Sequence, residues 1–168
     1  IYRAVAKGEP SMDRIETVSG DAVHEPGNFK APFGMNQAEL IEAAGGYKVD
    51  PEKIISGGPM MGFSMFTVDV PVTKTSSSIL CFTKDEVAQY EPTACINCGR
   101  CVEVCPSRLI PSRLADYAEH HDEEAFTKHE GLECMECGSC SYVCPAKRQL
   151  KQAIGSMRKT ALANRKKK

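Results

Sequence analysis

The cysteines set the chemistry that this chain can perform. Eight of the nine fall into two runs with identical spacing: Cys95, Cys98, Cys101 and Cys105, then Cys134, Cys137, Cys140 and Cys144. A proline follows each run at once, so the pattern C-x2-C-x2-C-x3-C-P occurs twice. Four thiolates at this spacing are typical of a 4Fe-4S cluster. The sequence therefore predicts two such clusters.

The same spacing predicts how the backbone must run. Three cysteines placed three residues apart would point to different sides of a regular helix, so we expect them on a loop wrapped around the iron. Gly99 and Gly138 precede the third cysteine of each run and permit a tight, left-handed turn. Pro106 and Pro145 fix the direction in which the chain leaves.

The fourth cysteine of each run has a separate role. In two-cluster ferredoxins it binds the cluster of the other run. We therefore predict two ligand sets, which are Cys95, Cys98, Cys101 and Cys144 for one cluster, and Cys134, Cys137, Cys140 and Cys105 for the other. This exchange would make the two clusters neighbours.

Other uses of the cysteines fit less well. A zinc-stabilised interaction module is an alternative, but a four-ligand zinc site needs neither the third cysteine at the same interval nor the final proline. Disulfides are not expected, because the C-x2-C spacing without a secretory leader indicates a reducing compartment. Cys81 lies in an apolar segment, and we expect it to be a small buried side chain. His120, His121 and His129 lie among acidic residues, and we expect a solvated face there.

Basic residues flank the cysteines. They are Arg100, Arg108, Lys147 and Arg148. A cluster with its thiolates is anionic, so nearby positive charge should stabilise the reduced form. The alternative is that these side chains are simply solvated.

Length, composition and net charge limit the class of protein. The chain has 168 residues, of which 42% are hydrophobic and 26% charged, with a net charge of -1. These values are normal for a globular protein of one ordinary domain or two small ones. No apolar run approaches the length of about 18 residues that spans a bilayer, so any membrane association would be peripheral. The chain opens at Ile1 without a methionine, and we expect further chain upstream.

The part before the cysteines predicts a small α+β unit. Alternating or apolar patterns predict strands at residues 13–19, 28–32, 53–56, 65–70 and 78–83. Asn36 is a good N-cap for a helix that ends at Gly45 and Gly46. This order is typical of a β-grasp domain, which we place at residues 1–88. The glycine-rich segment 57–62 is interpreted as a turn, because it lacks the Lys and Ser/Thr of a phosphate loop.

The part that contains the cysteines predicts a helical domain. We expect an α-helical two-cluster ferredoxin domain at residues 89–152. The segment 112–131 between the runs suits two short helices, with Ser112 as a candidate cap. Residues 153–168 are basic and are expected to form a tail that solubilises the chain, docks an acidic partner or approaches anionic lipid. Nucleic-acid binding is not expected, because no recognition motif accompanies the charge.

Several motifs together carry a resemblance to a known family. They are V-S-G-D-A-V-H-E-P-G-N-F, I-I-S-G-G-P-M-M-G and P-V-T-K-T-S-S-S-I-L, followed by the two cysteine runs. From about Arg14 to Gln152 the chain resembles the C-terminal part of the C subunit of the Rnf electron-transport complex, an ion-translocating ferredoxin:NAD oxidoreductase. The resemblance implies a β-grasp domain of the soluble-ligand-binding type followed by a helical two-cluster ferredoxin domain. The flavin-containing cobalamin reductase of propanediol metabolism has a similar layout and is an alternative.

The resemblance also implies cofactors and partners. FMN and NADH are implied only for an upstream domain, because this chain shows no dinucleotide fingerprint. A cluster with four thiolates exchanges single electrons and has no open position. We therefore expect an electron relay without substrate turnover of its own, serving an upstream flavin and a ferredoxin-type carrier. The implied partners are other subunits of a membrane redox complex, which would hold the chain peripherally at the cytoplasmic face of the cell membrane.

Overall fold

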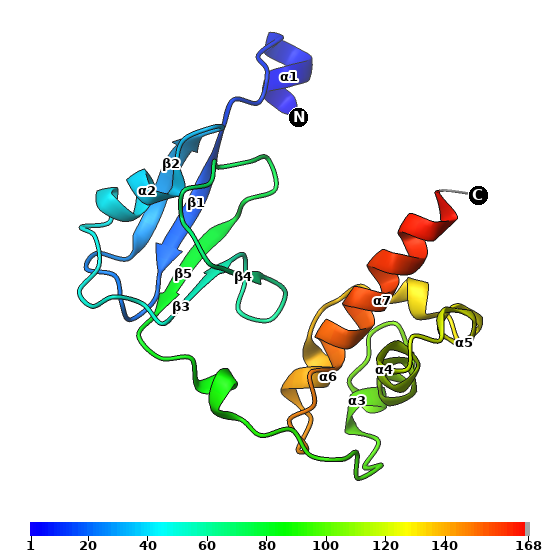
Figure 1. Ribbon diagram of the computed structural model, residues 1–168. Helices are drawn as coiled ribbons and strands as arrows, with labels where there is room; N and C mark the ends of the chain where they lie inside the picture. The colour runs from blue at the N-terminus through cyan, green and yellow to red at the C-terminus, as the bar shows by residue number, and fades with distance from the viewer. Residues whose placement is uncertain (167–168) are drawn as a thin grey trace. The chain divides into compact units, whose positions relative to one another are not determined.

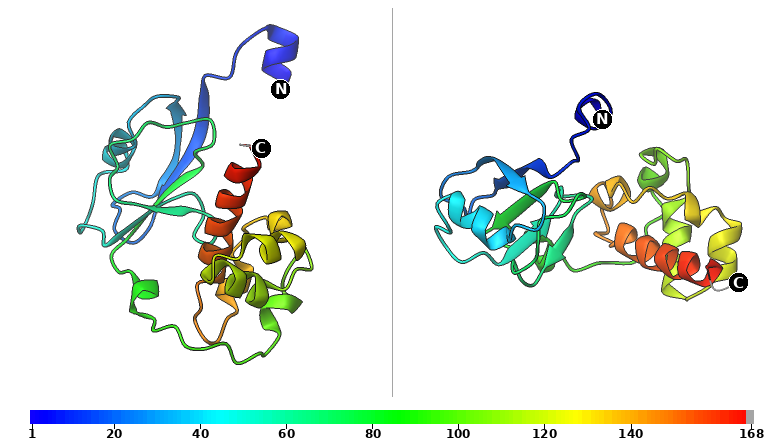
Figure 2. Two further views of the ribbon diagram at one scale, coloured as in Figure 1. Left: turned by 45° about the vertical axis from the view of Figure 1, so that its right-hand side comes forward. Right: turned by 90° about the horizontal axis from the view of Figure 1, so that it is seen from above.

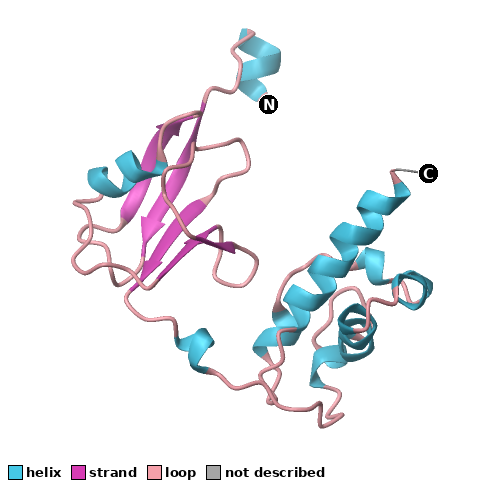
Figure 3. Ribbon diagram, viewed as in Figure 1, coloured by secondary structure: helices cyan, strands magenta, loops and turns pink. Residues whose placement is uncertain are grey.

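The computed structural model describes residues 1–166 and divides into two compact units, residues 1–88 and the residues from 89 on. Figure 1 traces the elements of each unit, and Figure 3 shows that the strands lie in the first unit while the second is helical. A short helix, α1 (Tyr2–Lys7), precedes the sheet and buries none of its residues. Another short turn of helix, η1 (Glu86–Gln89), lies at the division between the units. The mixed α+β class expected from the sequence is confirmed.

The first unit is built on a five-stranded sheet. Its strands are β1 (Asp13–Ser19), β2 (Gly27–Pro32), β3 (Lys53–Ser56), β4 (Phe63–Met65) and β5 (Ser78–Phe82). They lie in the order β2-β1-β5-β3-β4. The hairpin of β1 and β2 is antiparallel, β5 runs parallel to β1, and β3 pairs antiparallel with β5. This arrangement is the β-grasp-like one that the order of predicted elements indicates.

Helix α2 (Gln37–Ala43) packs on one face of this sheet (Figure 2). Its start agrees with the prediction, because the side-chain oxygen of Asn36 accepts a hydrogen bond from the Ala38 N–H at 2.9 Å. Leu40 and Ile41 on the helix join residues of the central strand β5, such as Ile79, in the buried core. The hairpin, the helix and the central strand β5 therefore share one hydrophobic core, and Ile54 of β3 packs against it.

The predicted strand at 65–70 is wrong. Strand β4 covers only Phe63–Met65, and the chain turns away directly afterwards. The Thr67 hydroxyl accepts a hydrogen bond from the Asp69 N–H at 3.1 Å, a local bond that competes with strand pairing. Phe66 is fully exposed at the same place. The alternating apolar residues of this segment therefore do not line one face of a strand.

The second unit is an assembly of short helices around one longer helix. Its elements are α3 (Arg100–Glu103), α4 (Pro111–Glu119), α5 (Glu123–Lys128), η2 (Gly131–Glu133), α6 (Ser139–Tyr142) and α7 (Leu150–Arg165). Helices α4 and α5 are the two short helices expected between the cysteine runs. Helix α4 begins at Pro111 without a side-chain cap, so the expected cap at Ser112 is wrong. Proline at the first helical position replaces it, because its fixed φ suits a helix start.

The expected basic tail from residue 153 is instead part of a packed helix. Helix α7 runs without a break from Leu150 to Arg165. Ile154, Met157 and Ala161 are buried in the second unit. Their spacing of three and four residues forms an apolar stripe, while the basic side chains of this helix are more exposed. Lys167 and Lys168 lie outside the described residues.

Helix α7 should therefore contribute directly to stability. We expect Ile154→Ala to lower the free energy of unfolding of the second unit by about 2–5 kcal/mol, because it leaves a cavity beside Leu114 and Phe126. Ser156→Ala, at an exposed position two residues further along the same helix, is the matched control and should change little. Urea denaturation followed by far-UV circular dichroism measures both variants. Equal, small effects of the two substitutions would contradict the packing of α7.

Candidate iron-sulfur sites

The two cysteine runs fold in the same way. The first two cysteines of each run lie on a loop, and the third lies in the short helix that follows. Gly99 and Gly138 take left-handed conformations with φ of 77° and 83°, and α3 and α6 begin at the next residue. The Gly99 carbonyl accepts from the Val102 N–H at 2.9 Å, and the Gly138 carbonyl accepts from the Ser141 N–H at 3.1 Å. The glycine turn expected from the sequence is confirmed in both runs.

Residues other than glycine repeat this geometry. Asn97 and Glu136, each two residues after the first cysteine, have φ of 54° and 55°. Arg108 and Lys147, each three residues after the fourth cysteine, both have φ of 53°. Left-handed conformations are uncommon for such residues. Their recurrence at matched positions shows that one loop design is used twice.

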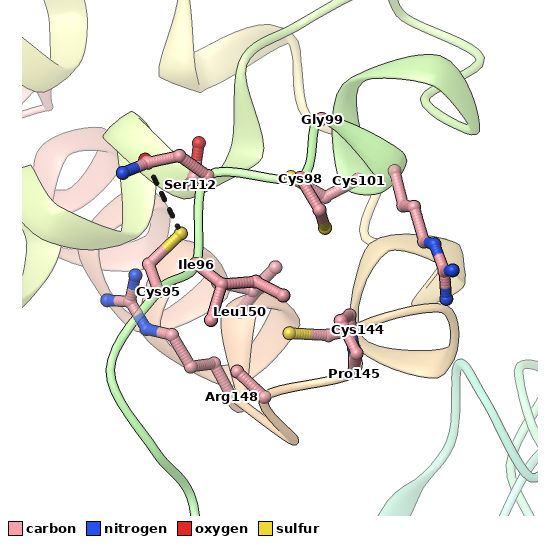
Figure 4. Close-up of a pocket in the computed structure, with 13 residues that line it drawn as sticks. Cys95, Ile96, Cys98, Gly99, Cys101, Ser112, Cys144, Pro145, Arg148 and Leu150 are labelled. Carbon is pink, nitrogen blue, oxygen red and sulfur yellow. Dashed lines mark hydrogen bonds between the residues drawn. The ribbon is translucent and has the colours of Figure 1, made fainter.

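The eight cysteines gather into two groups. A cavity of about 110 Å³ is lined by Cys95, Cys98, Cys101 and Cys144. A tighter cavity of about 20 Å³ is lined by Cys134, Cys137, Cys140 and Cys105. Each group thus contains three cysteines of one run and the fourth of the other. Figure 4 shows the first cavity, with the side chains of Cys95, Cys98 and Cys144 around a common space.

Backbone N–H groups reach the sulfur atoms. The Leu109 N–H donates to Cys105 Sγ at 3.4 Å, and the Glu136 N–H donates to Cys134 Sγ at 3.4 Å. Both sulfurs belong to the second group, and such donors stabilise the thiolate form that a ligand of a 4Fe-4S cluster must have. Within residues 1–166 no three His, Cys, Asp or Glu side chains converge to hold a single metal ion. A cluster bonds each thiolate to a different iron, so its ligands surround a space rather than meet at one point.

The second group lies in the more enclosed environment. Burial raises the pKa of Cys140 to about 11 and also raises the pKa of Cys134. Hydrogen bonding by Ser139 lowers the pKa of Cys137. In the first group, Cys95 and Cys98 are exposed. Since thiols must lose their protons to bind iron, loading of either group would release protons.

Two of the flanking cations lie at the first group, and one of them is held in place. Arg100 and Arg148 both line the first cavity. Nη2 of Arg148 lies 2.8 Å from Oδ1 of Asp116 and 2.9 Å from Oε1 of Glu119, both on α4. The Arg148 side chain is only 12% exposed. It is therefore a fixed link between the first group and α4 rather than a freely solvated side chain.

Lys147 and two of the histidines make local contacts. Lys147 lies over the ring of Tyr90, with its Nζ 4.4 Å from the ring centroid. His120 Nδ1 lies 2.7 Å from the Asp116 carbonyl oxygen, and His129 Nδ1 lies 2.9 Å from that of Ala125. Both histidines thus interact with carbonyls at the ends of their own helices, on an exposed surface.

One charged pair at the second group is not apparent from the sequence. Glu136 lines the second cavity, and its Oε1 lies 3.3 Å from Nη1 of Arg158 on α7. The sequence predicts a basic tail at Arg158 and assigns Glu136 no role. Alignment of the two cysteine runs would have drawn attention to Glu136, because it stands where the first run has Asn97. Nothing in the sequence pairs it with a residue 22 positions away.

Fold and cysteine geometry together define a ferredoxin-type iron-sulfur unit joined to a β-grasp unit. Comparison with protein families agrees, since residues 94–148 match the 4Fe-4S dicluster domain and residues 16–64 match the SLBB domain. The prediction of a ferredoxin-type domain for 4Fe-4S clusters is thereby confirmed.

Curated relatives identify the particular family, and three of them are C subunits of ion-translocating complexes. The chain is 41% identical over 167 residues to that of the Na(+)-translocating ferredoxin:NAD(+) oxidoreductase complex of Acetobacterium woodii, a match that covers 99% of this chain and 38% of the relative. It is 45% identical over 115 residues to that of the proton-translocating ferredoxin:NAD(+) oxidoreductase complex of Clostridium ljungdahlii, covering 68% of this chain and 25% of the relative. It is 40% identical over 130 residues to the C subunit of the ion-translocating oxidoreductase complex of Yersinia pestis, a match that covers 77% of this chain and 21% of the relative.

The chain therefore belongs to the family of C subunits of the Rnf-type ion-translocating ferredoxin:NAD oxidoreductases, and the resemblance expected from the sequence is confirmed. It spans between about a fifth and two fifths of the length of these relatives. Among the described residues, no helix has the length and apolar character needed to cross a membrane.

Cys81, the ninth cysteine, is fully buried on β5, as predicted. Burial raises the pKa of its thiol to about 11, so at pH 8 the thiol stays protonated and unreactive. We expect iodoacetamide at pH 8 to modify Cys81 only after the chain is unfolded in urea. Peptide mass spectrometry measures the modification in both states. Equally rapid modification of Cys81 in the folded protein would show that β5 opens readily.

Proposed function

We propose that the eight cysteines hold two 4Fe-4S clusters and that the chain relays single electrons within an ion-translocating ferredoxin:NAD oxidoreductase complex. The observation that carries this proposal is the grouping of the sulfurs. Each cavity is lined by three cysteines of one run and the fourth of the other. An exchanged fourth ligand is characteristic of two-cluster ferredoxins, where it keeps the two centres close.

The residues of this chain would hold the clusters, shield them from water and offset their negative charge. When bound, each cluster supplies one-electron chemistry and, with four thiolate ligands, no open position for a substrate. The backbone N–H groups of Leu109 and Glu136 would offset negative charge on the sulfurs. Arg148, held by α4, would do the same at the first site. Buried Leu114 and Ile154 line the second cavity and would exclude water from it.

The names of the relatives support a set of partners. A ferredoxin and NAD(+) occur in the names of the A. woodii and C. ljungdahlii proteins, as does an ion-translocating complex of several subunits. We infer that this chain exchanges electrons with a ferredoxin-type carrier, with partner subunits and with an upstream domain that binds FMN and NADH. It would have no substrate turnover of its own. Its place would be peripheral, at the cytoplasmic face of the membrane, through those subunits.

Metal analysis and spectroscopy of anaerobically purified protein test the proposal. We expect about eight irons and eight sulfides per chain and a broad visible absorption that bleaches on reduction with dithionite. Protein reconstituted with iron and sulfide serves as the second preparation. A colourless protein that holds two zinc ions and takes up no iron in either preparation would instead support the zinc-stabilised module.

The exchanged ligand assignment predicts the effect of single cysteine substitutions. We expect Cys105→Ser to impair the cluster whose other ligands are Cys134, Cys137 and Cys140, because its sulfur lines their cavity. Iron content should fall by up to about one half, with the first cluster intact. Cys81→Ser, in strand β5 of the first unit and outside both runs, is the control and should keep all the iron. Loss of only the cluster of the first run in Cys105→Ser would overturn the exchange.

A further inference from the structure

The two cysteine runs share a backbone conformation at one matched position but carry a different charge there. Asn97 in the first run and Glu136 in the second occupy matched positions, with φ of 54° and 55°. Both line the cavity of their own run. The second site therefore carries a carboxylate where the first carries a neutral amide.

Glu136 lies directly against the second group of sulfurs. Its N–H donates to Cys134 Sγ at 3.4 Å, so its backbone is fixed relative to a proposed ligand. Its side chain is only 23% exposed. A charge that is largely removed from water acts more strongly on its neighbours than a solvated one, because the effective dielectric constant is lower.

Arg158 of helix α7 holds this carboxylate in place. Nη1 of Arg158 lies 3.3 Å from Oε1 of Glu136, and its Nε donates to the Leu132 carbonyl at 2.9 Å. One guanidinium therefore joins α7 both to the side chain beside the sulfurs and to the backbone just before them. The Arg158 side chain is 30% exposed, so this pair is also shielded from solvent.

Helix α7 is shaped to accept the Glu136 side chain. Gly155 lies on α7 one turn before Arg158 and is buried. A Cβ atom at Gly155 would lie 3.0 Å from Oε2 of Glu136, which is closer than ordinary contact. The absence of a side chain at Gly155 leaves room for the carboxylate against the helix.

We propose that Glu136 and Arg158 set the reduction potential of the second site independently of the first. This inference rests on the proposed function, because it requires a cluster at that site. Reduction adds one electron, and thus one negative charge, without breaking a bond. The carboxylate disfavours that added charge and the guanidinium favours it. The two residues act as positioning and tuning residues and not as ligands.

EPR-monitored potentiometry of the anaerobic, iron-loaded chain tests the inference. Two one-electron steps are expected in the wild type, with dithionite and mediators as the source of electrons. In Glu136→Gln, the reduction step of the second cluster should move to more positive potential. The expected change is about tenfold in the equilibrium constant for reduction, which equals 59 mV for one electron. In Arg158→Ala, the same step should move to more negative potential, because the carboxylate is left unpaired. The other step should stay in place.

The control is Lys159→Ala, which removes an equal charge from the adjacent, exposed position on α7 and should move neither step. Glu136→Gln keeps the shape of the side chain, so it decides the matter even if Arg158→Ala loses iron. Full iron content with no positive shift in Glu136→Gln would overturn the inference alone. Equal shifts of both reduction steps in Glu136→Gln would also overturn the inference. A wild type without reducible iron would overturn the proposed function and this inference with it.

Discussion

The second unit depends on one constraint, which is that the fourth cysteine of each run must reach the cavity of the other run. Cys105 and Cys144 meet this constraint because the same loop, glycine turn and short helix are used in both runs. Neither cavity is complete without both runs. The two runs must therefore fold as one body, and any cluster bound at one cavity would be close to the other.

The helices outside the cysteine runs hold this arrangement together. Phe126 on α5, Leu114 on α4 and Ile154 on α7 form one buried core, and several of the cysteines pack against it. Charged pairs connect the same helices to the sites, through Arg148 at the first cavity and Arg158 at the second. Core packing thus fixes the loops, and the ion pairs place charge beside the sulfurs.

Local patterns allow much of this to be predicted from the sequence. Cysteine spacing indicates both sites because ligand spacing is a short-range property of the chain. Strands β1 and β3 and the Asn36 cap follow from alternation and capping chemistry. The many basic residues of helix α7 suggest a tail instead, because they obscure a narrow apolar stripe. The Glu136–Arg158 pair could not be predicted, since it joins distant segments that only the tertiary fold brings together.

One segment of the β-grasp unit is also not predicted correctly from the sequence. Residues 65–70 alternate in a way that suits a strand, yet a hydrogen bond between Thr67 and Asp69 turns the chain instead. This bond involves only one side chain and one nearby N–H, so the alternation of apolar and polar residues does not predict it. The β-grasp-like arrangement of the sheet, by contrast, follows from the order of the elements, because few topologies accommodate a hairpin, a helix and further strands around one core.

Magnetic coupling between the two sites tests the central claim most directly. If exchanged fourth ligands hold two clusters side by side, the fully reduced protein should give a low-temperature EPR spectrum that integrates to two spins and is broadened and split by their interaction. Partial reduction should give a simpler spectrum of isolated spins. A fully reduced sample with a single spin, or with two spins that show no interaction at any stage of reduction, would contradict the account.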